Sequence, residues 1–184
     1  DFMYPDRIVF GHEDSKTLEH MHEMYKPWDV DKIAVNTRSA EMIKYVNNSL
    51  LATQISTINE YSNIAKTIGN IDFNTVMNAV HLDKRWSPFD EITGDRIHPE
   101  IISYLKPGCG FGGSCFPKDV MALANLSKEI GLNPLILDSV IKVNELQPKV
   151  ILEHLEKKVG SLKYKKILVL GLAFKPDTDD VRES

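Results

Sequence analysis

Residues 38–68 read RSAEMIKYVNNSLLATQISTINEYSNIAKTI, and this stretch, which contains neither glycine nor proline, decides the fold of the chain. Its apolar residues recur at a helical spacing: Ala40, Ile43, Val46, Leu50, Leu51, Ile55, Ile58, Ile64 and Ile68. The pattern predicts one helix of about 30 residues, roughly 45 Å long. Because such a helix exceeds the usual length in globular domains, we expect it to be shared between domains or subunits.

A short α/β unit is expected before this stretch. Residues 7–11 and 33–35 have the pattern of strands, and residues 14–25 have the pattern of a helix. The order strand, helix, strand suits the last unit of an α/β sheet. A chain that begins directly on such a unit, at Asp1 and without methionine, is expected to be a cut product.

The pattern after residue 68 is helical and then changes once more. Helices are predicted at residues 72–80, 117–130 and 134–158, and residues 81–107 are expected to be irregular. The run KILVLG at residues 166–171 predicts a buried strand that opens a new α/β unit.

These pieces predict a mainly α central domain with a long helix, flanked by partial α/β, Rossmann-like segments. The expected boundaries place the end of one α/β domain at residues 1–36, the helical centre at 37–158, and the start of another α/β domain at 159–184.

Bulk composition indicates a soluble globular protein. Of 184 residues, 42% are hydrophobic and 26% are charged, and no apolar run approaches the roughly 18 residues that cross a bilayer. The N-terminus lacks the pattern of a signal peptide. A net charge of −4 without a long basic stripe argues against nucleic-acid binding.

The counts of cysteine and histidine exclude other classes of site. Two cysteines, Cys109 and Cys115, make no disulfide framework, so a reducing, cytoplasmic location is expected. None of the 6 histidines has a metal-ligating partner at a useful spacing, so no metal site is expected.

A glycine-rich loop at residues 108–119, GCGFGGSCFPKD, carries the strongest chemical signal. Its glycines allow the main chain to approach a ligand closely. Cys115 follows them near the start of an expected helix, where the helix dipole and Lys118 favour the thiolate. This setting indicates a covalent nucleophile, although an ordinary lone cysteine is a small buried residue.

Three more polar side chains are candidates for the chemistry. Asp119 lies four residues after Cys115, so both share one helix face, and the carboxylate can orient a water or the thiol. Lys44 and Asn48 are also four residues apart and can form a donor pair for a developing oxyanion. Periodicity alone reads this pair as exposed surface residues of the long helix.

The loop at residues 108–119 resembles the catalytic loop of the nucleotide-sugar dehydrogenases, the UDP-glucose and GDP-mannose dehydrogenase family. Lys44 and Asn48 resemble the lysine–asparagine pair that this family carries at the same spacing on its long helix. The resemblance implies two Rossmann-like domains joined by a helical domain, which commonly forms a homodimer through the long helix. Residues 1–36 would then end the NAD-binding domain, and residues 159–184 would begin the nucleotide-sugar-binding domain.

The resemblance also implies a reaction, the oxidation of the C6 hydroxyl of a nucleotide-linked hexose to a carboxylate with two hydride transfers to NAD. Such products serve polysaccharide biosynthesis. Cys115 would form a thiohemiacetal and then a thioester, Lys44 and Asn48 would stabilise oxyanions, and Asp119 would position the water or Lys44. UDP-glucose is the leading substrate, and UDP-N-acetylmannosamine and GDP-mannose stay open.

Further ligand contacts follow from matching motifs. Residues 174–184, FKPDTDDVRES, resemble a family element of the nucleotide-sugar pocket, in which Lys175 would contact the substrate. Lys175 and Arg182 are also expected to contact the cofactor. Arg96 loosely resembles an arginine that reaches the substrate, and Arg85 rivals it for this role. The remaining predicted substrate-binding residues are Tyr104, Leu105, Lys106, Phe111, Gly112, Phe116 and Lys118.

Two other interpretations stay open from the residues alone. Residues 37–158 could form an obligate homodimerisation module without chemistry of its own. A thiol enzyme of another class would need a histidine beside Cys115, and the loop contains none. Within the dehydrogenase interpretation, the 184 residues alone are expected to bind NAD poorly and not to turn over.

Overall fold

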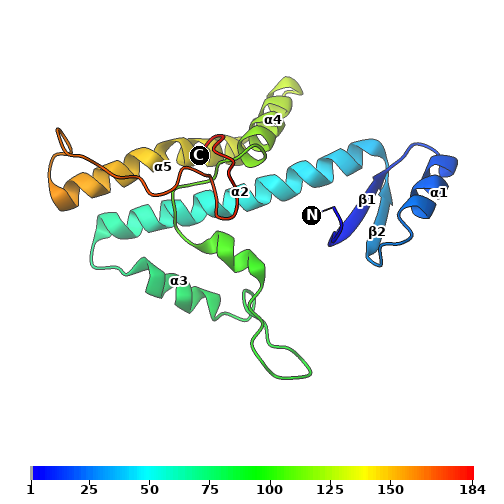
Figure 1. The fold of residues 1–184 in the computed structure, drawn as a ribbon, viewed down its shortest axis with the longest axis horizontal. Coiled ribbons are helices and arrows are strands. Elements are labelled where there is room, and N and C mark those ends of the chain that lie inside the picture. Colours follow the sequence, from blue (N-terminus) through cyan, green and yellow to red (C-terminus); the bar gives the residue numbers. More distant parts are fainter. Residues whose placement is uncertain (1) are drawn as a thin grey trace. The chain divides into compact units, whose positions relative to one another are not determined.

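The computed structural model describes residues 2–184 of the chain. These residues form two compact units, which are divided between Asn47 and Asn48. Figure 1 shows the strands near the N-terminus and the helices that follow them. Within residues 2–184, none of the helices combines the length and the apolar character that crossing a membrane requires.

The first unit contains the predicted strand–helix–strand. Strands β1 (Arg7–Gly11) and β2 (Asp31–Val35) pair in parallel, and helix α1 (Ser15–Met24) connects them (Figure 1). Asp14 caps α1 because its carboxylate accepts a hydrogen bond of 2.8 Å from the Thr17 N–H. The prediction of an α/β segment is confirmed here.

Helix α2 (Thr37–Ile68) confirms the long helix that the sequence predicts, with 32 residues. The Asn36 side chain accepts a hydrogen bond of 2.8 Å from the Ser39 N–H at its start. The helix ends before Gly69, which has a φ of 83°. Its buried residues are mostly small or polar: Ser49, Ala52, Ser56, Ile58, Asn59, Ser62 and Ala65.

The buried face of α2 is therefore formed mostly by small and polar residues. Leu50, Ile64 and Ile68 are each half or more exposed. Small buried residues let neighbouring helices approach α2 closely. Of the larger apolar residues, Leu50 and Ile64 are exposed, whereas Ile58 is buried in a core cluster. The sharing of α2 with another domain or subunit stays a prediction.

The second unit is helical. Helices α3 (Phe73–His81), α4 (Phe116–Glu129) and α5 (Leu135–Val159) lie close to their predicted ranges, and a short 3-10 helix, η1 (Glu100–Leu105), precedes the glycine-rich loop. One core cluster joins Ala52, Val120 and Val140, from α2, α4 and α5. A second cluster joins Ile58, Met77 and Leu105.

The predicted strand at residues 166–171 is wrong. These residues are irregular, and Leu168 and Leu170 are more than four-fifths exposed. A strand is completed by hydrogen bonds to a neighbour, and among residues 2–184 the only strands pair with each other as β1 and β2. The segment that follows α5 therefore crosses the second unit as an extended coil (Figure 1).

Candidate functional site

Cys115 lies at the N-terminal boundary of α4, and its thiol is exposed and forms no disulfide. The Ser114 hydroxyl lies 3.8 Å from the Cys115 Sγ, and the N-cap position makes no side-chain hydrogen bond to the helix. The helix N-terminus places the positive end of the dipole at this sulfur. The location matches the setting that favours a reactive thiol, because an exposed sulfur can reach a substrate carbon.

Asp119 is fully buried one turn further along α4. Its two carboxylate oxygens accept hydrogen bonds of 2.7 Å from Asn48 Nδ2 and 2.6 Å from Lys118 Nζ. Its main-chain N–H donates to the Cys115 carbonyl over 2.9 Å. A buried carboxylate needs such partners, so Asp119 connects three of the predicted site residues.

Lys44 lies on α2, in the first unit, and its side chain is exposed. Its ammonium stands 5.8 Å from the centre of the Tyr45 ring, within the range of a cation–π interaction. The catalytic role of Lys44 stays a prediction.

Aromatic side chains surround the glycine-rich loop. The Phe111 and Phe116 rings meet edge to face with centres 6.1 Å apart, and the Tyr104 ring lies 6.3 Å from Phe116. Phe111 and Phe116 also pack on the core cluster that contains Val120. Leu105 is 4% exposed and belongs to the second core cluster, and its predicted substrate contact stays a prediction.

The C-terminal segment packs on the glycine-rich loop. The Gly113 N–H donates to the Arg182 carbonyl over 2.8 Å. A Cβ at Gly112 would overlap the Glu183 carbonyl oxygen, and a Cβ at Gly113 would lie 2.8 Å from the Phe174 ring. Both glycines are needed for this close approach, which brings two segments far apart in the sequence together.

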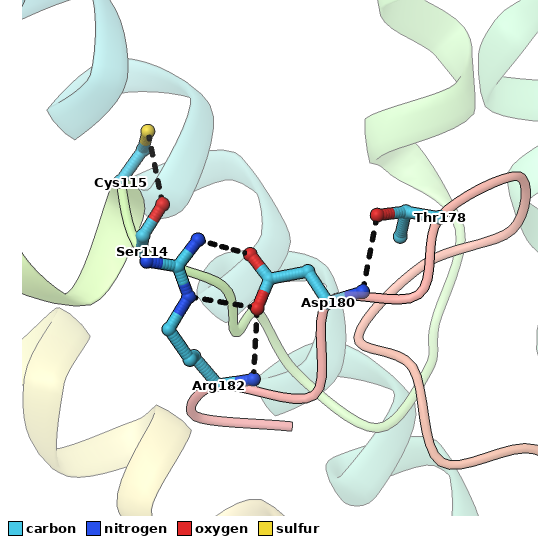
Figure 2. Close-up of polar contacts among 5 residues, drawn as sticks. All are labelled: Ser114, Cys115, Thr178, Asp180 and Arg182. Carbon is cyan, nitrogen blue, oxygen red and sulfur yellow. Dashed lines mark hydrogen bonds and ion pairs between the residues drawn. The ribbon is translucent and has the colours of Figure 1, made fainter.

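Arg182 forms a two-pronged ion pair beside the candidate nucleophile. Its Nε and Nη2 donate to the two oxygens of Asp180 over 2.9 and 2.8 Å, and Figure 2 shows this pair next to Ser114 and Cys115. Hydrogen bonds from the Arg182 side chain, and from its main chain, lower the pKa of Asp180 to about 2. The predicted cofactor contact of Arg182 stays untested, and its guanidinium is already engaged within the segment.

The other cations predicted to contact ligand lie on the surface of the second unit. Lys118 and Lys106 are exposed, and Lys175 is exposed with its ammonium 5.6 Å from the centre of the Phe174 ring. Lys106 also contributes to the lowered pKa of His81, for which burial is the larger cause. Exposed ammonium groups beside the loop can contact phosphate or sugar oxygens.

Arg96 and Arg85, the two alternatives predicted for the substrate contact, both bind groups within the irregular region. Arg96 Nη1 donates to the carbonyls of Leu82 and Ser87, each over 2.9 Å, and its guanidinium stacks 4.4 Å from the Phe89 ring centre. Arg85 pairs with Asp83, which holds the pKa of that carboxyl well below its usual range. The predicted substrate contact of Arg96 stays a prediction.

Three amide side chains that bind the loop were missed from the sequence. Asn59 and Gln147 bind the two main-chain polar groups of Gly108, and Asn144 binds both main-chain groups of Phe111. They lie on α2 and α5, far from the loop in sequence. Polar residues on amphipathic helices give no local signal of such a contact, so only the fold reveals it.

The described residues bear on two kinds of ligand, a metal ion and a dinucleotide. Within the described chain, no group of His, Cys, Asp and Glu side chains is arranged to hold a metal ion. Gly108, Gly110 and Gly113 have the spacing G-x-G-x-x-G, but η1 precedes them, whereas a dinucleotide-binding turn follows a strand. The loop therefore lacks the preceding strand of a dinucleotide-binding turn, and its contact with a substrate stays a prediction.

Comparison with known proteins gives consistent matches. The model of the UDP-glucose/GDP-mannose dehydrogenase family, central domain, matches residues 38–146. UDP-glucose 6-dehydrogenase YwqF of Bacillus subtilis is 40% identical over 184 residues, which are 100% of this chain and 38% of that protein. UDP-glucose 6-dehydrogenase AglM of Haloferax volcanii is 36% identical over 189 residues, with 100% and 40% of the two chains covered.

A solved structure agrees with these matches. The UDP-glucose dehydrogenase of the hyperthermophilic archaeon Pyrobaculum islandicum superposes with a TM-score of 0.85 at 42% identity, covering 100% of this chain and 39% of that one. The chain thus spans 38% to 40% of the length of these relatives.

Proposed function

Since this chain belongs to the UDP-glucose/GDP-mannose dehydrogenase family, we propose that it is part of an NAD-dependent enzyme that oxidises the C6 hydroxyl of UDP-glucose to a carboxylate. UDP-glucose is the proposed sugar because relatives that are 36% to 40% identical are named as UDP-glucose 6-dehydrogenases. The observation that carries the proposal is the exposed thiol of Cys115 at the start of α4, one turn from the buried Asp119.

The thiol divides the second oxidation into two easier steps. The C6 alcohol first loses a proton and a hydride to become an aldehyde. The Cys115 sulfur then bonds to the aldehyde carbon, and the carbonyl oxygen takes the thiol proton to give a thiohemiacetal. Loss of a second hydride and a proton gives a thioester, and water attacks it, breaks the carbon–sulfur bond and releases the carboxylate. NAD, when bound, supplies the hydride acceptor for both oxidations.

Asn48 and Lys44 are assigned to the oxygen that gains negative charge at C6. The Asn48 amide is fixed by its hydrogen bond of 2.7 Å to Asp119, so its second N–H is oriented in advance. Both Asp119 oxygens accept hydrogen bonds and the residue is fully buried. We therefore assign Asp119 as a positioning residue for Asn48 and Lys118, and Lys44 as a donor or proton acceptor at the same oxygen.

The proposal places the dinucleotide mainly on parts of the whole protein outside these residues. The first unit supplies two parallel strands, β1 and β2, and the relatives are more than twice as long as this chain. Lys175 and Arg182 are proposed to contact the cofactor. Two free cysteines fit a reducing, cytoplasmic location, which is part of the same proposal.

A second copy of the chain is the proposed partner of α2. An apolar groove of about 620 Å³ runs between α2 and α3, and Tyr61, Ile64 and Ile68 on its edge are half or more exposed. Its full lining is Thr53, Gln54, Thr57, Ile58, Tyr61, Ile64, Ala65, Ile68, Ile71, Phe73, Val76, Met77, Val80, Trp86 and Leu105. A large exposed apolar surface on a helix supports burial against another subunit.

The test measures NADH formed per UDP-glucose by the whole protein and by its Cys115→Ala variant. The whole protein is expected to form two NADH for each sugar consumed, because both oxidations occur at one site. Loss of the nucleophile is expected to lower the steady-state rate by at least about 10³-fold. Full activity of Cys115→Ala would refute the covalent mechanism, and one NADH per sugar would refute the oxidation to a carboxylate.

A further inference from the structure

The glycine-rich loop before Cys115 depends on side-chain amides for its main-chain hydrogen bonds. Gly108 donates from its N–H to Asn59 Oδ1 over 2.8 Å, and its carbonyl accepts from Gln147 Nε2 over 2.7 Å. Phe111 donates from its N–H to Asn144 Oδ1 over 2.8 Å, and its carbonyl accepts from Asn144 Nδ2 over 2.9 Å. The loop lies between η1 and α4 and has no helical ladder, so these four bonds replace secondary structure.

Two of these amides are built into the interior. Asn59 is 1% exposed and Gln147 is 2% exposed. Asn63, one turn from Asn59 on α2, donates to Gln147 Oε1 over 3.0 Å and fixes the orientation of that amide. A buried amide without partners is costly, so the bonds to Gly108 offset part of the cost of burying Asn59 and Gln147. Asn59 Nδ2 has no hydrogen-bond partner within the described residues.

Gly110 of the loop and Pro148 of α5 both affect the surroundings of Asn144. Gly110 has a φ of 101°, and a Cβ at this position would overlap Asn144 Oδ1. Pro148 lies inside α5 and has no N–H for the Asn144 carbonyl, so α5 departs from a regular hydrogen-bond ladder at the turn that carries Asn144 and Gln147. The absence of a side chain at Gly110 leaves room for the Asn144 amide to reach the loop.

The held loop leads directly to the nucleophile. Phe111 is four residues before Cys115, and its ring packs against Phe116, the residue that follows the thiol. Fixing Phe111 at its N–H, its carbonyl and its ring thus restricts the chain on both sides of the sulfur. A displacement of about 1 Å in a reacting group can lower a rate by roughly 10²-fold.

We propose that Asn144, supported by Asn59, Asn63 and Gln147, is a positioning residue that fixes the glycine-rich loop and thereby places the Cys115 sulfur for attack. The proposal rests on the proposed function of Cys115. Asn144 acts on the reaction through the main chain of Phe111 and makes no contact of its own with the sugar. Its removal therefore changes the chemical step and leaves substrate binding nearly unchanged.

The experiment compares Asn144→Asp with Asn125→Asp in the whole protein. Asn144→Asp keeps the size of the side chain and an acceptor for the Phe111 N–H, but it removes the donor and places a carboxylate oxygen against the Phe111 carbonyl. Asn125 is exposed on α4, so the control adds the same charge away from the loop. Kinetics with UDP-glucose and hydrogen exchange of the peptide that covers residues 108–114 are measured for both variants.

Asn144→Asp is expected to lower kcat by about tenfold to a hundredfold, to change KM for UDP-glucose by less than about threefold, and to speed exchange in residues 108–114. The control is expected to match the unaltered protein in all three. A kcat within about twofold, or unchanged exchange in the loop, would overturn the proposal. A fall in kcat with an equal rise in KM and a lowered melting temperature would also overturn it, because general destabilisation would then explain the loss.

Cys115→Ala, measured in parallel, separates the two levels of the argument. An active Cys115→Ala variant refutes the proposed function. An inactive Cys115→Ala variant together with a normal Asn144→Asp variant retains the nucleophile and refutes only the positioning role.

Discussion

Replacing Gly113 by alanine tests the contact between the glycine-rich loop and the C-terminal segment. Gly113 has a φ of 78°, where an L-residue costs about 1–2 kcal/mol. The new Cβ would also lie 2.8 to 2.9 Å from three atoms of the Phe174 ring. Forcing a ring out of a packed position adds about 1–3 kcal/mol. Gly113→Ala is therefore expected to lower the free energy of unfolding by about 2–5 kcal/mol.

Gly131→Ala provides a matched control. Gly131 has a φ of 81°, and nothing lies within 4 Å of its ideal Cβ position. This variant carries the backbone strain without the clash, so it is expected to lose about 1–2 kcal/mol. The difference between the two variants measures the contact with Phe174 alone.

The assay is urea unfolding followed by circular dichroism, for both variants in the original chain and in a Phe174→Ala background. With the ring removed, Gly113→Ala is expected to cost no more than Gly131→Ala. Equal costs for Gly113→Ala and Gly131→Ala in the original chain would show that Phe174 does not cover Gly113. The placement of residues 174–183 on the loop would then be wrong.

Two further predictions concern the core and the histidines. Val120 is fully buried in the core cluster on which Phe111 and Phe116 pack. Val120→Ala is therefore expected to lower the free energy of unfolding, measured by urea unfolding, by about 1.5–3 kcal/mol. A loss under about 0.5 kcal/mol would contradict this packing. Burial lowers the pKa of His81 and of His154 below the usual 6.5, so the folded state binds fewer protons than the unfolded chain just below that pH. The free energy of unfolding is therefore highest above pH 6.5 and decreases as the pH falls below it. His81→Leu is expected to flatten this part of the plot of unfolding free energy against pH. A plot that keeps its full slope in the variant would exclude His81 as a cause.

The helices were predictable because their signals are local. The spacing of apolar residues, the Asp72 cap and the breakers Gly69 and Gly131 mark helix ends that the structure reproduces within one or two residues. The strand at 166–171 was not predictable from its own residues, because a strand is completed by neighbours. An apolar run of six residues has the same pattern whether or not those neighbours are present.

The residues of the candidate site also differ in how far local sequence predicts their positions. The placement of Cys115 at the start of α4 and of Asp119 one turn later was predictable, because the loop and the helix are continuous in sequence. The structure adds that Asn48, 71 residues away, binds Asp119. Asn59, Asn144 and Gln147 were not predictable, since their contacts depend on how α2 and α5 pack. The engagement of Arg96 with main-chain carbonyls was hidden for the same reason.

The most direct test follows alkylation of the two cysteines by mass spectrometry while NADH formation from UDP-glucose is measured. Cys109 and Cys115 are both exposed, so Cys109 serves as an internal control within the same loop. We expect the rate of NADH formation to fall in proportion to the fraction of Cys115 that is alkylated, with UDP-glucose slowing that alkylation. Undiminished NADH formation by protein fully alkylated at Cys115 would contradict the role of this sulfur as the nucleophile.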